Sequence, residues 1–361
     1  MDLTSWQLDA GLVDCADVRY ARRGRLALIV LDRPRALNAL TLDMVRSLRA
    51  QLTAWRDDDT VGAVAITGTG GRALCAGGDV VAARRGALAG GAERDRAAEF
   101  FTVEYEVNRL IARFPKPYVA FMEGVTMGGG LGMSAHGTVR LVDPAAKVAM
   151  PETGIGFFPD VGIRHVLASA PGQVGAHLVM TGVTISGADA VHAGLADAVV
   201  PSAEFAQVVE RCVDGPPPTL TELGLDASAF APQSALSEAR SWIDECYVGD
   251  DAALILDRLR AHPLPAAQEA AQMIEGRSPF AVTLALASLR EAQRLADVDA
   301  VLDQDQLIVR SILDEPDFHE GVRAQLVDKD RRPQWRHADL AEVDEAQVRA
   351  VLDGSAVPSG V

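Results

Sequence analysis

The sequence predicts an α/β domain over residues 1–200, followed by a mainly helical region over residues 201–361. In the first part, short apolar runs alternate with segments of helical periodicity, which is the pattern of strands that alternate with helices. From Pro201 onward the chain is rich in alanine and in charged residues at helical spacing. Three prolines at 216–218 predict a linker or loop in this second region.

The first elements follow from the spacing of apolar residues. Arg25–Leu31 is an apolar run that predicts a buried strand, and a turn at 32–35 ends it. A helix is predicted from about Leu42 to Trp55, with Asn38 or Thr41 as its N-cap. Further strands are predicted at Val61–Thr67, Tyr118–Met122, Val139–Val142 and Lys147–Met150, and helices at 93–113, 163–170, 172–181, 251–260, 280–295 and 299–312.

Composition and charge exclude several classes of protein. Hydrophobic residues make up 48% and charged residues 23%, which is typical of a globular protein. The formal net charge is −16, so we expect neither nucleic acid nor an anionic membrane as a partner. A phosphorylated ligand remains compatible with this charge, because a few local Arg or Lys side chains suffice to bind it.

Targeting and metal-binding patterns are not found. The N-terminal stretch is polar and acidic, and no apolar run approaches membrane-spanning length, so we expect a cytoplasmic protein. The four cysteines and seven histidines are scattered without metal-ligand spacing. We therefore expect reduced thiols and no metal.

Two glycine turns are the first candidate functional feature. Gly77-Gly78 follow the second predicted strand, and Gly128–Gly130 follow the third. Small and apolar residues at 131–136 predict a helix after the triple glycine, whose free N–H groups would face an anion. Glycine lets a ligand approach the backbone closely, so two such turns can direct two N–H groups at one oxygen.

Carboxylates are the second candidate feature. Glu152 and Asp160 lie eight positions apart in an otherwise apolar segment, where a carboxylate needs a partner or a function. Glu104, within a predicted helix, is a third candidate acid, although periodicity alone favours an exposed charge there. A serine hydrolase is rejected, because Ser134 in GMSAHG does not match the G-x-S-x-G pattern. Carboxylates with oxyanion donors indicate acyl chemistry.

Four segments together resemble the enoyl-CoA hydratase/isomerase (crotonase) superfamily. They are LDRPRALNALTLDM, ALCAGGDV, MEGVTMGGGLG and MPETGIGFFPD, all within residues 20–200. The resemblance implies a crotonase-like spiral of ββα repeats and coenzyme A thioester substrates. It also implies an oxyanion hole formed by the backbone N–H groups of Gly78 and Gly129. Residues 1–200 would then be the catalytic core that binds the thioester.

Within that superfamily the chain most resembles the 3-hydroxyisobutyryl-CoA hydrolase subgroup, which acts in valine catabolism. The match rests on MPETGIGFFPDVG and on two C-terminal segments, SPFAVT and DFHEGVRAQLVDKDRRPQW. The resemblance implies that Glu152 and Asp160 are catalytic and that Glu104 contacts the substrate. Coenzyme A, as part of the substrate, is expected along the Arg33–Leu37 turn and at Gly77, with Arg33 or Arg35 meeting its phosphates. No separate cofactor is implied, and a homo-oligomer is possible.

One departure separates the chain from hydratases of the superfamily. Gly132 stands where those enzymes carry a catalytic glutamate after the triple glycine, and residues 125–140 contain no acid. Glu152 is expected to attack the thioester or to act as general base on water, and the sequence leaves both open. A hydratase or isomerase with altered acid placement, and a non-catalytic protein that binds CoA esters, remain as alternatives. A smaller departure from the hydrolases is Ile163-Arg164-His165, where further glycines and an aromatic residue are expected.

Overall fold

The computed structural model describes residues 6–213, 220–221 and 234–355, and the chain divides into two compact units. Unit 1 comprises Met1–Gly78, Val103–Val148 and Ile185–Ser237. Unit 2 comprises Asp79–Thr102, Ala149–Thr184 and Glu238–Val361. The predicted proline linker at 216–218 lies outside the described residues. A functional division at residue 200 stays a prediction.

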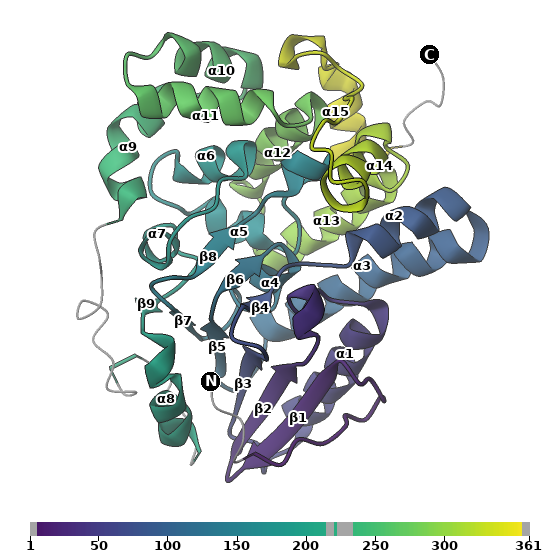
Figure 1. The fold of residues 1–361 in the computed structure, drawn as a ribbon, viewed down its shortest axis with the longest axis vertical. Helices are drawn as coiled ribbons and strands as arrows, with labels where there is room; N and C mark the ends of the chain where they lie inside the picture. The colour runs from purple at the N-terminus through teal and green to yellow at the C-terminus, as the bar shows by residue number, and fades with distance from the viewer. Residues whose placement is uncertain (1–5, 214–219, 222–233, 356–361) are drawn as a thin grey trace. The chain divides into compact units, whose positions relative to one another are not determined.

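Unit 1 contains a six-stranded sheet of mostly parallel strands (Figure 1). Its order is β1-β2-β3-β5-β7-β9, and only the β1–β2 pair is antiparallel. Every residue of β2 and β5 is buried, as expected for strands of a parallel sheet that is covered on both faces. The bounds are β1 Val18–Arg23, β2 Leu26–Leu31, β3 Ala63–Gly68, β5 Tyr118–Met122, β7 Val139–Val142 and β9 Ala198–Val199.

A second sheet, in the order β4-β6-β8, is built from short strands. They are β4 Ala73–Cys75, β6 Val125–Met127 and β8 Lys147–Ala149, whose last residue falls in unit 2. In each of the repeats β3–β4, β5–β6 and β7–β8, the first strand joins the large sheet and the second joins the small one. This succession confirms the predicted ββα repeats.

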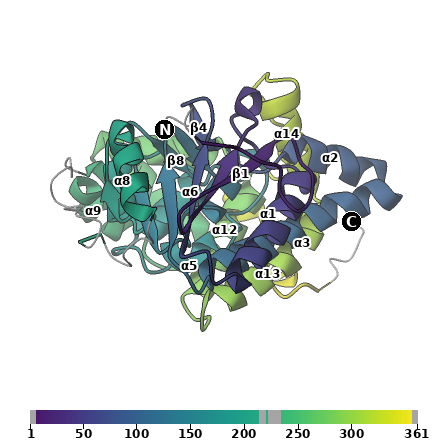
Figure 2. The same ribbon diagram turned by 90° about the horizontal axis from the view of Figure 1, so that it is seen from below.

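Helix α1 (Leu42–Asp57) packs beside β1 (Figure 2). Thr41 is its N-cap, since the Thr41 hydroxyl accepts a hydrogen bond of 3.3 Å from the Met44 N–H. The Trp55 and Tyr20 rings meet edge to face at 5.6 Å. The other helices of unit 1 are η1 Pro34–Ala36, α4 Gly129–Gly132, α7 Gly187–His192, η3 Ser202–Glu204 and α8 Phe205–Cys212.

Unit 2 is built largely from helices. Every described element from Ser202 onward is a helix, which confirms the predicted helical character of the C-terminal region. Helix α12 (Pro279–Ala292) is central to it and packs against α5, α6, α11 and α15. The remaining helices are α2 Val80–Ala89, η2 Glu152–Ile155, α5 Ile163–Leu167, α6 Val174–Thr181, α10 Ala252–Ala261, α11 Pro265–Glu275, α13 Val298–Ile312, α14 Pro316–Val322, η4 Arg323–Val327, η5 Leu340–Glu342 and α15 Glu345–Leu352. Helices α3 (Gly91–Ala112) and α9 (Ala235–Cys246) cross from one unit to the other.

The helix expected at 131–136 is shorter and begins earlier, because α4 spans only Gly129–Gly132. Gly128 is its N-cap, so two of the three glycines lie inside the helix rather than before it. The first glycine alone makes the turn from β6. Strand β1 and helix α2 were not predicted from the sequence, because the apolar residues of neither segment recur at a regular spacing.

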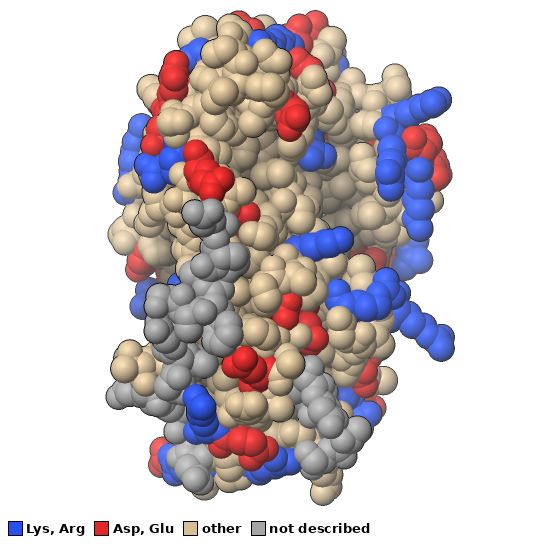
Figure 3. Space-filling model, turned by 60° about the vertical axis from the view of Figure 1, so that its left-hand side comes forward, with Lys and Arg blue, Asp and Glu red and all other residues tan. Residues whose placement is uncertain are grey.

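Cysteine state, surface charge and helix hydrophobicity were also predicted from the sequence. All four cysteines are free and buried. Acidic and basic side chains lie interspersed with uncharged ones on the face that Figure 3 shows. Within the described parts of the chain, no helix is both long enough and apolar enough to cross a bilayer.

Candidate active site

The first glycine turn is held by a cysteine. Gly77 has φ +110°, a conformation that favours glycine, and its N–H donates to the Cys75 sulfur at 3.4 Å. The Cys75 thiol in turn donates to the Gly77 carbonyl at 3.6 Å. Burial raises the pKa of the Cys75 thiol to about 12, so it stays protonated and able to donate. Cys75 therefore fixes the backbone that leads to Gly78.

Each position of the triple-glycine turn favours glycine for a different steric reason. Gly128 has φ +50°. A Cβ atom on Gly129 would lie 2.3 Å from Glu104 Oε1, and one on Gly130 would lie 2.2 Å from the Cys75 carbonyl oxygen. Real Cβ contacts are essentially never below 3.0 Å, so a side chain at Gly130 would collide with backbone, and one at Gly129 would force the Glu104 carboxylate or the Gly129 backbone to move.

The two predicted oxyanion donors lie close together in unit 1. A Cβ atom on Gly129 would be 3.4 Å from the Gly78 nitrogen, and one on Gly77 would be 3.8 Å from the Gly129 nitrogen. Gly129 is the first residue of α4, so its N–H has no partner within the helix. The Gly78 N–H has no protein acceptor among the described residues. Two neighbouring N–H groups without protein acceptors are compatible with the predicted oxyanion hole, whose role stays a prediction.

Glu104 lies beside these donors on α3 and is buried, with 2% of its surface exposed. The sequence pattern favoured an exposed helix charge at this position, and the structure corrects that interpretation. Its Oε1 is the atom nearest to a Cβ placed on Gly129. Glu104 thus lies next to the position of a group bound near the Gly129 N–H.

The two candidate phosphate-binding arginines differ in their surroundings. Arg33 donates to the Ala39 carbonyl at 3.0 Å and lies 3.9 Å from Asp17. Arg35 is exposed, and no hydrogen bond or ion pair of its side chain is found within the described residues. Arg33 therefore supports the turn itself, and Arg35 is the better candidate for a phosphate.

Asn38 is a residue whose importance the sequence did not reveal. It is fully buried with φ +57°, and its Oδ1 accepts the Arg33 N–H at 2.9 Å. Its Nδ2 donates to the Ala73 carbonyl at 2.9 Å. Asn38 therefore ties the arginine turn to the start of β4, the strand that leads into the Gly78 turn.

In unit 2, Glu152 opens the short helix η2 and is 7% exposed. Its Oε2 is buried and has no hydrogen-bond partner among the described residues. Burial raises the pKa of Glu152 well above its usual value of 4.5, and the negative charge of Asp160 raises it further. A desolvated carboxylate with a raised pKa is a stronger base than an exposed one, which suits proton abstraction or nucleophilic attack.

The segment that carries Glu152 is clamped by the C-terminal helices of unit 2. The Ser278 N–H donates to the Thr153 carbonyl at 3.1 Å. A Cβ atom on Gly156 would lie 2.2 Å from Asp317 backbone atoms, and one on Gly321 would lie 2.4 Å from Ile155. Ser278 itself donates to Asp317 at 2.5 Å. The segments SPFAVT and DFHEG therefore place η2 against α12 and α14.

The predicted site residues fall into two groups. Unit 1 brings together Gly77, Gly78, Gly129 and Glu104 near the arginine turn. Unit 2 brings together Glu152 and Asp160, whose charges interact. Catalytic roles for these residues stay predictions.

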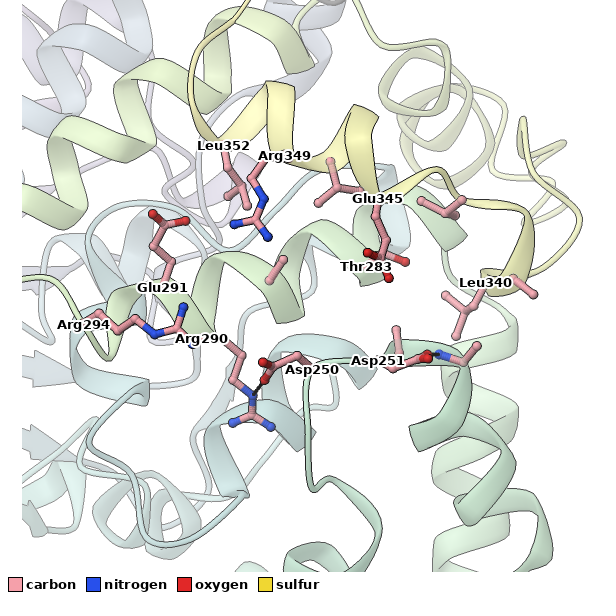
Figure 4. Close-up of a pocket in the computed structure, with 16 residues that line it drawn as sticks. Asp250, Asp251, Thr283, Arg290, Glu291, Arg294, Leu340, Glu345, Arg349 and Leu352 are labelled. Atoms are coloured by element: carbon pink, nitrogen blue, oxygen red, sulfur yellow. Dashed lines mark hydrogen bonds and ion pairs between the residues drawn. The ribbon is translucent and has the colours of Figure 1, made fainter.

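A pocket of about 580 Å³ in unit 2 shares no residue with these groups (Figure 4). It is lined by residues of α10, α12, η5 and α15, and Arg290 at its wall pairs with Asp250 at 3.4 Å. Arg294 and Arg349 line it together with Glu291 and Glu345. This mixture of charges does not select an anionic or a cationic ligand.

Comparison with known proteins identifies the family. The sequence model described as enoyl-CoA hydratase/isomerase matches residues 26–352. The chain belongs to the enoyl-CoA hydratase/isomerase family. Two relatives within it are mitochondrial 3-hydroxyisobutyryl-CoA hydrolases. The Rattus norvegicus protein is 35% identical over 93% of this chain and 89% of its own length. The Homo sapiens protein is also 35% identical, over 91% of this chain and 86% of its own length.

Solved structures of the family confirm the predicted crotonase-like fold. A carnitinyl-CoA dehydratase from Mycobacterium thermoresistibile is 45% identical with a TM-score of 0.88, covering 96% of this chain and 98% of its own. An enoyl-CoA hydratase from Rhodobacter sphaeroides is 37% identical with a TM-score of 0.87, covering 93% and 97%. The family acts on acyl-CoA substrates. This chain therefore belongs to a family of enzymes that act on CoA esters.

Proposed function

We propose that this protein hydrolyses a short-chain 3-hydroxyacyl-CoA thioester, with 3-hydroxyisobutyryl-CoA as the preferred substrate. The observation that carries the proposal is the buried Glu152, whose Oε2 has no partner in the described residues and whose basicity is raised by burial and by Asp160. The relatives named 3-hydroxyisobutyryl-CoA hydrolase, which align along almost the whole chain, support the choice of substrate.

The residues take the following roles in the proposed reaction. The Gly78 and Gly129 N–H groups stabilise the negative charge that develops on the thioester oxygen. Loss of one such donor typically costs about 2.7–4 kcal/mol of transition-state stabilisation. Glu104 and Asp160 orient the substrate hydroxyl or the attacking water. Arg35, which is exposed on the turn after β2, meets a phosphate of coenzyme A.

Glu152 acts as a carboxylate in either of two routes. In the first, a carboxylate oxygen attacks the thioester carbon, the C–S bond breaks, and the CoA thiolate leaves and takes up a proton. Water then cleaves the mixed anhydride and regenerates Glu152. In the second, Glu152 accepts a proton from the water that attacks the thioester carbon, the C–S bond breaks, and Glu152 returns the proton to the departing CoA thiolate. Both routes yield the free acid and CoA, and no cofactor takes part.

A hydratase or dehydratase is the second candidate, and a specific observation favours it. The structure that is 45% identical to this chain is named a carnitinyl-CoA dehydratase. Against it stands Gly132, where hydratases of the superfamily carry a catalytic glutamate, together with the absence of any acid in residues 125–140.

A thioester panel tests the proposal. Release of thiol from 3-hydroxyisobutyryl-, 3-hydroxypropionyl-, acetyl- and crotonyl-CoA is followed with a thiol-reactive dye. We expect rapid release from the hydroxyacyl esters alone, and almost none from them in Glu152→Gln, which should still bind them. Glu315→Gln is the matched control, because Glu315 is also a buried glutamate of unit 2 with a raised pKa. Full activity in Glu152→Gln would refute the assignment.

The same panel separates the rival functions. Loss of the enoyl absorbance of crotonyl-CoA without thiol release would identify a hydratase. An increase in melting temperature with every ester, without turnover of any, would identify a protein that only binds CoA esters.

A further inference from the structure

The turn that carries Asp160 has an unusual backbone. Val161 has φ +54° and Gly162 has φ +72°. A β-branched residue such as valine rarely adopts a positive φ, because its side chain crowds the backbone there. Such a conformation persists only where the surrounding structure holds the backbone in place.

One side chain holds this turn from a distant part of the sequence. The Gly162 N–H donates to Asp305 Oδ2 at 2.8 Å, and the Arg164 guanidinium pairs with the other oxygen, Oδ1. Asp305 lies on α13, and Arg164 lies on α5, which packs against both α12 and α13 (Figure 1). Both side chains are 0% exposed.

Arg164 is itself held on several sides. Its Nη1 donates to the Ser288 carbonyl at 2.8 Å and to Gln304 Oε1 at 2.7 Å. Its guanidinium carbon lies 5.7 Å from the centre of the Phe158 ring. The arginine is therefore fixed in one position and presents a fixed charge to Asp305.

Stability alone is a weak reason for this arrangement. A buried ion pair pays a large desolvation cost, and replacing it by apolar residues of similar volume is often neutral or stabilising. The feature that an apolar pair cannot reproduce is the hydrogen bond that the Asp305 carboxylate accepts from the Gly162 N–H. That bond acts on the turn two residues from Asp160.

We propose that Asp305, oriented by Arg164, is a positioning residue that holds the Asp160–Gly162 turn and so places the Asp160 carboxylate for the reaction. The proposal rests on the proposed function, in which Asp160 orients the substrate hydroxyl or the water. It also accounts for Arg164, which stands where the sequence departs from the hydrolases. Arg164 and Asp305 form one unit that acts through Asp160 and does not touch the substrate.

Two charge-neutral double variants test the proposal. Arg164→Met/Asp305→Asn and Arg164→Met/Asp305→Leu both remove the ion pair, but only asparagine retains an oxygen that accepts the Gly162 N–H. Asparagine and leucine have similar branched shapes, so the two melting temperatures should agree within a few degrees. We expect kcat to be about 10 to 100-fold lower in the leucine double variant, with KM within about threefold, because misplacement by about 1 Å can cost 10²-fold in rate.

The same pair is compared in the Asp160→Ala background. If Asp305 acts through Asp160, the two double variants should then differ by no more than about twofold, because the group being positioned is gone. A purely structural role would preserve the full difference. Equal kcat values in the presence of Asp160, or an undiminished difference in its absence, would overturn the proposal.

Amide hydrogen exchange provides a readout that does not depend on turnover. The Gly162 amide should exchange faster in the leucine double variant than in the asparagine double variant. Absence of thiol release from the wild-type protein would defeat the proposed function, and the exchange comparison would then decide the role of Asp305 by itself. Equal protection of Gly162 in both double variants would overturn that role.

Discussion

Replacing Gly129 by alanine tests the oxyanion hole with a single methyl group. The added Cβ would lie 2.3 Å from Glu104 Oε1, 3.3 Å from Leu40 Cδ1 and 3.4 Å from the Gly78 nitrogen. Its contact with Glu104 falls about 0.7 Å short of the 3.0 Å limit for real Cβ atoms. Glu104 is buried, so either its carboxylate or the Gly129 backbone has to move.

The expected loss in rate follows from that displacement. The methyl group would also stand beside the Gly78 N–H, where the oxyanion is expected to bind. Loss of one oxyanion donor costs about 2.7–4 kcal/mol, which corresponds to about 10² to 10³ in kcat. Overpacking of a buried site costs about 1–3 kcal/mol of stability, so Gly129→Ala should still fold and melt a few degrees lower.

The assay is thiol release from 3-hydroxyisobutyryl-CoA, with melting temperature measured on the same samples. Gly276→Ala is the control, because its Cβ would meet only ordinary contacts of 3.5 and 3.7 Å and its φ of −80° suits alanine. We expect wild-type kcat in the control. A Gly129→Ala protein that folds and retains wild-type kcat would refute the placement of the oxyanion at Gly129.

Three further predictions concern charge. Because the pKa of Glu152 is raised above 4.5, its protonated form contributes stability at low pH that is lost as pH rises toward the folded-state pKa. Glu152→Gln should therefore match the wild-type melting temperature near pH 4 and exceed it, by calorimetry, once the pH is above 4.5. A melting temperature below that of the wild type at pH 8 would contradict this sign. Asp160→Asn removes the charge that helps to raise the Glu152 pKa, so the acidic limb of the kcat/KM profile should move to lower pH, and a shift to higher pH would be inconsistent with the coupling. Arg35→Ala should raise KM for the CoA ester several-fold without changing kcat, and should leave a truncated N-acetylcysteamine thioester unaffected. Equal KM changes for both substrates would remove Arg35 from the phosphate contact.

Local pattern predicted much of the fold. Strands β5 and β7 and helix α1 with its Thr41 cap lie where apolar spacing and capping place them. The two glycine turns were visible because each breaks a strand pattern with residues that admit positive φ. The sequence could not show why three consecutive glycines are required, because Gly130 lies against Cys75, which is far from it in the sequence.

Long-range contacts explain what the sequence did not reveal. Asp305 is 141 residues from Arg164, and its role follows only from the packing of α5 against α13. Glu104 has the spacing of an exposed helix charge, yet it is buried beside Gly129. In the sequence, Arg33 and Arg35 are equally good candidates for binding a phosphate. The structure distinguishes them, because the Arg33 side chain donates a hydrogen bond to the Ala39 carbonyl. These roles depend on which residues the fold brings into contact, and local periodicity in the sequence does not predict such contacts.

The most direct test of the central claim is to follow thiol release and enoyl absorbance together, with 3-hydroxyisobutyryl-CoA and crotonyl-CoA as separate substrates. Our account predicts thiol release from 3-hydroxyisobutyryl-CoA that is lost in Glu152→Gln, with crotonyl-CoA left unchanged. Hydration of crotonyl-CoA without any release of thiol from 3-hydroxyisobutyryl-CoA would contradict it.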